Sequence, residues 1–127
     1  MGLFDLIFKK HKKISVLPAT IENIKREWSL IEDLLKGKQP SQLRQALISA
    51  DKTLDNALRD MVIGESMGER LKNSSEIFEK GLYNRIWEAH KLRNNLVHES
   101  GFEVKSFILE QNIEQFRKAL NYLGIGV

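Results

Sequence analysis

Apolar residues recur every three or four positions along most of this chain, which is the spacing of a buried helix face. The pattern predicts a helix from Thr20 to Gly37, followed by a longer one from residue 41 to about residue 62. The apolar residues of the longer segment fall within about 120° of the helix circumference. Ser41 is the expected cap of this helix, because a serine hydroxyl satisfies free amides at a helix start.

Start and stop signals continue in the middle of the chain. Ser66 and Glu69 have the spacing of a capping box and predict a turn followed by a short helix. Residues 73–76 (Asn-Ser-Ser-Glu) repeat this type of start signal, and Gly81 is expected at the join to a further helix.

The last third of the chain predicts two more helices. The first runs from Leu82 to about Val97, and after a break at residues 100–101 the second is capped by Ser106 and ends at Gly124. No strand pattern occurs anywhere in the sequence. We therefore predict an all-α fold, an antiparallel up-and-down bundle of four to five helices.

The N-terminal segment, residues 1–14, differs from the helical domain expected over residues 15–127. Its apolar residues from Leu3 to Phe8 and Ile14 share one helical arc, with lysines opposite, so it predicts an extra amphipathic helix. Such a helix can lie on an anionic membrane surface, or it can dock on its own domain or on a partner subunit. Since no secretory signal or membrane-spanning run is evident, we expect a cytoplasmic protein, with the inner face of the membrane as an alternative.

Composition restricts the chemistry. The chain of 127 residues has no cysteine, which excludes disulfides, thiolate nucleophiles and cysteine-based zinc sites. Its net charge of +3 comes from four lysines and one aspartate within residues 1–13, and charges cancel from Ile14 onward. The globular part is therefore not expected to attract nucleic acid broadly, so any RNA contact must be local.

Arg93 occupies an unusual place on the helix predicted from Leu82. At 100° per residue it lies about 20° from Leu82, in the middle of the apolar stripe. That stripe consists of Leu82, Ile86, Ala89, Leu96 and Val97. Because a guanidinium stays charged and is costly to bury alone, Arg93 must meet a carboxylate, backbone carbonyls, a ligand anion or a facing subunit.

A second stripe on the same helix is aromatic and polar. It holds Tyr83, Trp87, His90, Asn94 and His98. Such a stripe is by itself typical of a solvated or interface surface. Beside Arg93, however, a histidine supplies what metal-independent RNA cleavage needs, since imidazole moves protons and guanidinium stabilises charge on a phosphoryl group.

The spacing of Arg93 and His98 determines whether both can act on the same phosphate. Arg93 and His98 lie about 140° apart on a continuous helix, so one copy does not aim both at the same atom. Termination of the helix at residues 98–101 can bring them together, as can a twofold dimer that joins two copies of the motif.

Residues 89–99 (Ala-His-Lys-Leu-Arg-Asn-Asn-Leu-Val-His-Glu) resemble the signature of the HEPN superfamily, the higher eukaryotes and prokaryotes nucleotide-binding domain. Its pattern is an arginine, a polar residue that is often asparagine, a few variable positions and a histidine. Arg93, Asn94 and His98 match it, and Glu99 follows as in many members. Residues 21–124 also resemble a group of small bacterial proteins from candidate phyla, for which no activity is known.

The resemblance implies a helical bundle, frequently a homodimer, and in active members a metal-independent endoribonuclease that leaves 2',3'-cyclic phosphate ends. His98 would then be the acid or base, Arg93 would stabilise charge and Asn94 would position the substrate. His90, Tyr83, Trp87 and Glu99 are further candidates for substrate binding, with RNA or a nucleotide as ligand and no cofactor or metal. Other members are non-catalytic nucleotide-binding or dimerisation modules, and this alternative stays open.

The remaining charged residues suggest less. Asp51 and Asp55 are one helical turn apart and could bind a metal, but without a histidine or cysteine in register a solvated acidic edge is the favoured interpretation. Glu65, Glu69 and Arg70 are expected to make local caps and pairs, and His11 to belong to a solvated lysine-rich face.

Overall fold

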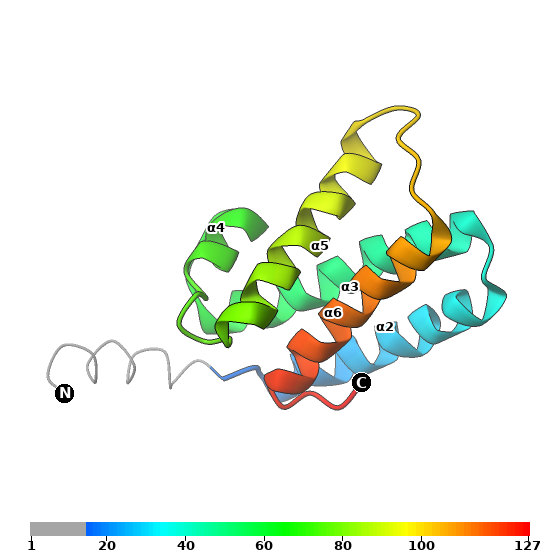
Figure 1. Cartoon of the computed structure of the whole chain (residues 1–127). Helices are drawn as coiled ribbons and strands as arrows, with labels where there is room; N and C mark the ends of the chain where they lie inside the picture. The colour runs from blue at the N-terminus through cyan, green and yellow to red at the C-terminus, as the bar shows by residue number, and fades with distance from the viewer. Residues whose placement is uncertain (1–14) are drawn as a thin grey trace, which may run out of the picture.

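Residues 15–127 are described by a computed structural model, and they fold into helices with no strand among them (Figure 1). The elements are α2 (Pro18–Gly37), α3 (Pro40–Met61), α4 (Met67–Lys72), α5 (Lys80–His98) and α6 (Ser106–Tyr122). The predicted all-α bundle is thus confirmed. The amphipathic helix predicted within residues 1–14 lies outside the described residues, and none of the described helices is long and apolar enough to cross a membrane.

Helix α3 is the central element, because it packs against each of the other four helices. Its apolar positions recur at helical spacing and are almost completely buried, as the sequence predicts. They are Leu43, Ala46, Leu47, Ala50, Leu54, Ala57 and Leu58. The long strip of small and branched side chains lets α2 and α6 lie along α3, which forms the main core of the bundle (Figure 1).

The helix starts differ from the predicted ones at four places, of which one is α5, which begins at Lys80 instead of Leu82. Helix α2 begins at Pro18 instead of Thr20, and α3 begins at Pro40, with Gln39 and not Ser41 in the capping position. Proline is preorganised for the first position of a helix, which explains both shifts. Ser106 is the first residue of α6 and makes no capping bond.

The segment between α4 and α5 contains no helix start, so the signal assigned to residues 73–76 is wrong. Ser74 is buried there, and its hydroxyl donates a hydrogen bond to the carbonyl of Leu71 at 2.8 Å. The chain then turns until Glu79, whose carboxylate accepts from the amide of Leu82 and caps α5. Gly81 accordingly lies within the first turn of α5 and not at a join between helices.

A buried ion pair fixes the short helix α4 on α3. Arg70 donates to both carboxylate oxygens of Asp55, at 2.6 and 3.0 Å, and to the carbonyl of Gly64 at 2.6 Å. The side chains of Arg70 and Asp55 are only 8% and 13% exposed. Asp55 is therefore not part of a solvated acidic edge, and Arg70 is a long-range anchor instead of a local pair.

Helices α2 and α6 are joined around Trp28, which is buried on the apolar face of α2. Its indole donates to Thr53 of α3 at 3.0 Å, and the guanidinium of Arg117 lies 4.7 Å from the ring centroid. Burial alone would lower the pKa of Arg117, but hydrogen bonds and electrostatic attraction to the carboxylates of Glu32 and Glu114 raise this pKa above its ordinary value. The cation therefore stays charged while it covers the aromatic ring.

The two arginines that approach Asp55 allow a matched test of this anchor. We expect Arg70→Ala to lower the free energy of unfolding by about 3 to 5 kcal/mol, because a buried carboxylate loses its main partner. Arg59→Ala should cost less than about 1 kcal/mol, since the Arg59 side chain is 59% exposed and lies 3.5 Å from Asp55. Urea denaturation of both variants measures the difference, and equal losses would contradict the anchoring role.

Candidate functional site

Helix α5 carries the predicted motif, and its two halves have different surroundings. Leu82, Ile86 and Ala89 are buried, as their place on the apolar stripe predicts. Toward the end of the helix, Leu96 is half-buried and Val97 is 45% exposed, so the stripe does not continue into the core. The reason is visible in Figure 1, where the last turns of α5 and the loop to α6 stand apart from the other helices.

Arg93 meets a carboxylate, which is one of the four partners that its position demands. Its Nε lies 3.5 Å from an oxygen of Asp51 on α3, and the two side chains are 29% and 5% exposed. Its Nη1 donates to the amide oxygen of Asn94 at 3.0 Å. The Nε itself is buried and forms no hydrogen bond within the described chain. Arg93 is therefore held from one side while part of its guanidinium remains accessible.

Asp51 is shared between Arg93 and His90. The Nδ1 of His90 lies 2.8 Å from the other oxygen of Asp51, and both side chains are more than nine-tenths buried. The Nε2 of His90 faces the amide nitrogen of Asn94 at 3.4 Å. The structure thus groups His90, Arg93 and Asn94 around a buried carboxylate, and the expectation that Asp51 belongs to a solvated edge is wrong.

The position of Asp51 in the sequence predicts its burial, although its charge suggests exposure to solvent. Asp51 follows Leu47 by four positions and precedes Leu54 by three, which places it on the apolar face of α3. Asp55 has the same relation to Leu58. An acidic residue at such a position demands a cation from a facing helix, as Arg93 demands an anion.

Tyr83 and Trp87, which the sequence suggests as substrate-binding residues, contact α4 and their own helix. The Tyr83 hydroxyl donates to the carbonyl of Leu71 at 2.8 Å. The Trp87 ring lies edge-to-face with Tyr83, at a centroid distance of 6.5 Å, and with His90 at 6.0 Å. The Tyr83 hydrogen bond links α5 to α4, and the Trp87 contacts order the aromatic side chains along α5, so both residues have a role in the fold whether or not they also contact a ligand.

An open hollow of about 380 Å³ lies between α4 and α5 and includes the Arg93 side of the motif. Ser66, Met67 and Gly68 form one wall of this hollow. Trp87, His90, Lys91, Arg93 and Asn94 form the other. Two cations, one amide and an indole ring therefore face the same space, which suits a ligand with an anionic group and a planar ring.

His98 lies in a different hollow, of about 480 Å³, at the far end of α5. Arg44 forms one side of this hollow and residues 96–103 form the rest, including Glu99. His98 is exposed and has no hydrogen-bond partner among residues 15–127. Because α5 stays helical through His98, its end does not bring the imidazole to Arg93, and the two groups face separate spaces in one copy.

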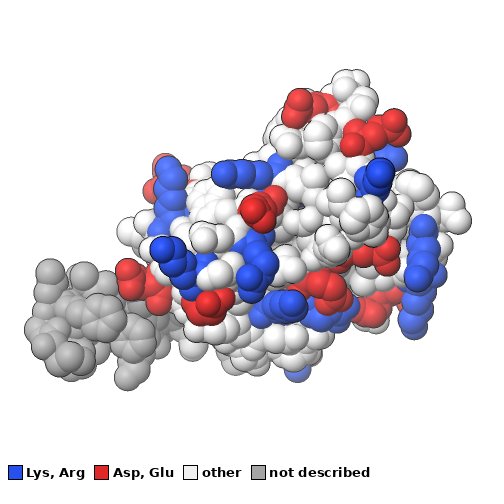
Figure 2. Space-filling view, in the orientation of Figure 1, with Lys and Arg blue, Asp and Glu red and all other residues white. Residues whose placement is uncertain are grey.

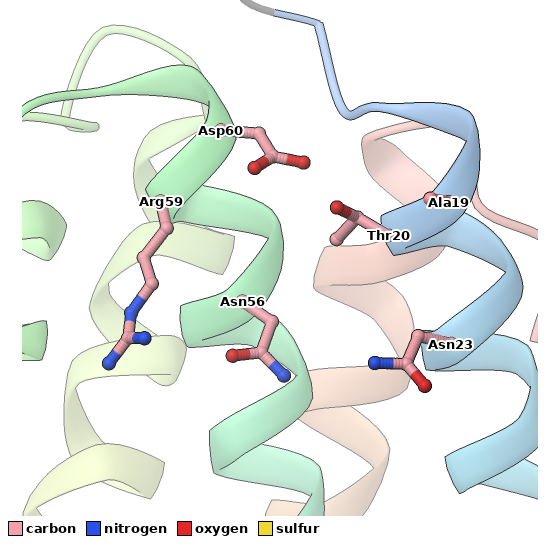
Figure 3. Close-up of a pocket in the computed structure, with 6 residues that line it drawn as sticks. All are labelled: Ala19, Thr20, Asn23, Asn56, Arg59 and Asp60. Carbon is pink, nitrogen blue, oxygen red and sulfur yellow. The ribbon is translucent and has the colours of Figure 1, made fainter.

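A third hollow, which contains none of the predicted residues, lies between α2 and α3 (Figure 3). Asn23 on α2 and Asn56 on α3 extend into it from opposite sides. Asp60, at its upper end in the view, accepts a hydrogen bond from the amide of Leu17 at 3.0 Å and so holds the start of α2. Asp60 therefore has a structural role at the contact between α2 and α3.

The distribution of surface charge agrees with local contact to an anionic ligand and not with a broad anion-binding surface. Blue and red side chains are interspersed over the face shown in Figure 2, without an extended region of one sign. Within residues 15–127, no group of three or more histidine and acidic side chains is arranged to hold a metal ion. Anion binding in this part of the chain would therefore depend on a few placed cations such as Arg93 and Lys91.

Comparison with known proteins does not assign the chain to a family. No family model matches it, and neither the curated proteins nor the solved structures include a match. The likeness of residues 89–99 to the HEPN signature thus stays a prediction, and function is inferred from the residues and their geometry.

The structural role of Tyr83 can be tested with the chain's two tyrosines. We expect Tyr83→Phe to lower the free energy of unfolding by about 1 kcal/mol, because the Leu71 carbonyl loses its donor. Tyr122→Phe is the control, since Tyr122 is 53% exposed and its hydroxyl has no partner among the described residues. Thermal and urea unfolding give both values. A Tyr83→Phe variant as stable as the wild type would show that the hydroxyl does not stabilise the α4–α5 contact.

Proposed function

We propose that this protein is a metal-independent endoribonuclease of the HEPN type, with reacting groups supplied by two copies of the chain. The observation that carries the proposal is the placement of Arg93. A buried carboxylate holds it at the wall of an open hollow, and Asn94 of the matching motif is bonded to it. Residues of the fold thus preorganise the cation, as charge stabilisation in a transition state requires.

The chemistry needs no group from outside the chain. The 2'-oxygen of a ribose attacks the adjacent phosphorus, its proton passes to a base, and the bond from phosphorus to the 5'-oxygen breaks as that oxygen takes up a proton. The products are a 2',3'-cyclic phosphate and a 5'-hydroxyl. His98 is the proton-transferring group, because imidazole titrates near neutral pH. Arg93 stabilises the charge that develops on the phosphoryl oxygens, and Asn94 positions them.

Two copies are required because Arg93 and His98 of one chain face different hollows. A twofold arrangement in which the ends of two α5 helices meet would place the His98 of one copy near the Arg93 of the other. The connection between α5 and α6 has an exposed apolar residue at each end, Val97 at 45% and Phe107 at 56% exposure. These side chains offer apolar surface for such a contact.

Loss of either reacting group tests the proposal directly. We expect Arg93→Ala and His98→Ala each to reduce cleavage of a single-stranded RNA by at least about 10²-fold, the usual worth of acid–base or charge-stabilising groups. Arg85→Ala is the matched control, because Arg85 is an exposed arginine on the same helix, outside both hollows. Gel analysis of cleavage, with detection of 2',3'-cyclic ends, measures the effect, and full activity in either variant would refute the proposal.

Mixing the two inactive variants tests whether the site is shared. If each site takes Arg93 from one copy and His98 from the other, a mixed dimer contains one intact site. A refolded equimolar mixture should then regain about a quarter of the wild-type activity, because half of the dimers are mixed and each has one of two sites. Absence of any recovery would place both groups in one copy and exclude the shared site.

A second candidate is a non-catalytic module in which the motif stabilises the fold or holds a nucleotide phosphate. Two observations favour it: Arg93 and Asn94 already have partners within the chain, and His98 shares its hollow with Glu99 and Glu103, which repel phosphate. In this case the wild type should bind nucleotide without cleaving RNA. A loss of stability in Arg93→Ala does not separate the two candidates, because the buried Asp51 loses a partner under both.

A further inference from the structure

Three hydrogen-bond contacts and one ion pair around Asp51 form a closed circuit of four side chains. From Asp51 the circuit runs to His90 at 2.8 Å, from His90 to Asn94 at 3.4 Å and from Asn94 to Arg93 at 3.0 Å. It returns from Arg93 to the second oxygen of Asp51 at 3.5 Å. Asp51 comes from α3 and the other three residues from α5, so the circuit links the motif to the central helix.

Only one set of donors and acceptors satisfies this circuit. The Asp51 carboxylate accepts hydrogen bonds, so the Nδ1 of His90 must donate and the Nε2 of the neutral ring must accept. The Nε2 then takes a hydrogen from the amide nitrogen of Asn94. This turns the amide oxygen of Asn94 toward Nη1 of Arg93, which can only donate.

The opposite orientation fails at a defined point. If the proton of His90 moves to Nε2, the amide of Asn94 must turn its oxygen to the ring and its nitrogen to Arg93. Two donors then face each other at the Asn94–Arg93 contact, and the Arg93 guanidinium loses a partner. The proton on Nδ1 of His90 therefore decides how Asn94 and Arg93 are held.

We infer that Asp51 and His90 are positioning residues, which fix the Asn94 amide and the Arg93 guanidinium through the Nδ1-protonated form of His90. For catalysis this inference rests on the proposed function, whereas the orientation itself does not. Neither residue would touch the reacting atoms. With Nε facing Asp51 and one Nη1 hydrogen on Asn94, Nη2 and the second Nη1 hydrogen have no partner in the described chain. Those hydrogens are the ones left for a phosphoryl group in the hollow beside α4.

The form of His90 can be measured without any activity. In the ¹⁵N-labelled full-length protein, long-range ¹⁵N–¹H correlation spectra distinguish a protonated ring nitrogen from a bare one. The three histidines of the chain can be assigned with His11→Gln and His98→Gln variants. We expect a single neutral form of His90 with the proton on Nδ1. A ring protonated on Nε2 alone, or an equal mixture, would overturn the inference.

Asp51→Asn is the sharpest variant, because it keeps the shape of the side chain but adds a donor. Its amide nitrogen must face either His90 or Arg93, and both are donors in the circuit. We expect the Nε2-protonated form of His90 to appear in this variant, and kcat for RNA cleavage to fall about 10²-fold with KM changed less than about threefold, as misplacement of a reacting group does. Asp33→Asn, on the exposed face of α2, is the control and should leave the spectrum and kcat unchanged.

The outcomes separate this inference from the proposed function. A wild type with Nδ1-protonated His90 that cleaves no RNA would refute the nuclease while upholding the orientation. An active wild type whose Asp51→Asn variant keeps its kcat would refute the positioning role. If Asp51→Asn does not fold, His90→Ala replaces it, since loss of the ring removes the hydrogen bond to Asn94 and should lower kcat similarly.

Discussion

Two carboxylates one turn apart on α3, Asp51 buried and Asp55 largely buried, are the constraint on which the rest of the structure depends. A buried carboxylate without a cation or hydrogen-bond donor is unstable by several kcal/mol, so Asp51 and Asp55 each require partners from elsewhere in the chain. Arg70 satisfies Asp55 and brings α4 onto α3, while His90 and Arg93 satisfy Asp51 and bring α5 there. The apolar strip of α3 drives burial, and these pairs select which faces of α4 and α5 are buried.

This arrangement makes the candidate site a part of the fold. Arg93 is held by the buried Asp51 of the central helix α3 and by the half-buried Asn94 of its own helix. His98 lies instead at the projecting end of α5, where its side chain is exposed. The fold therefore holds Arg93 directly, whereas nothing in the described chain holds the His98 imidazole.

Hydrophobic periodicity is sufficient for the four long helices, whereas the short helix α4 is predicted by its capping box. Periodicity does not fix the helix starts: Pro40 is the first residue of α3, so Gln39 replaces Ser41 as its cap, and Ser106 is itself the first residue of α6. It also failed for Asp51, Asp55 and Arg70, since a charged residue is ordinarily assigned to solvent and its partner lies on another helix. Arg93 is identified by its place within an otherwise apolar stripe, and its partner Asp51 has the same signature on α3. A search for a cation on the apolar face of one helix and an anion on the apolar face of another would predict the Arg93–Asp51 contact.

The separation of Arg93 and His98 has a further consequence for the proposed nuclease. The circuit around Asp51 is complete within one chain, so a single copy already holds the cation that would stabilise the transition state. The proton-transferring group is then the only part that a second copy must supply. In the proposed nuclease, association would therefore add one missing group to a prepared site and would not require either copy to reorganise its core. By mass action the concentration of such sites would rise with the square of the monomer concentration while monomers predominate, which would link cleavage to the amount of protein present.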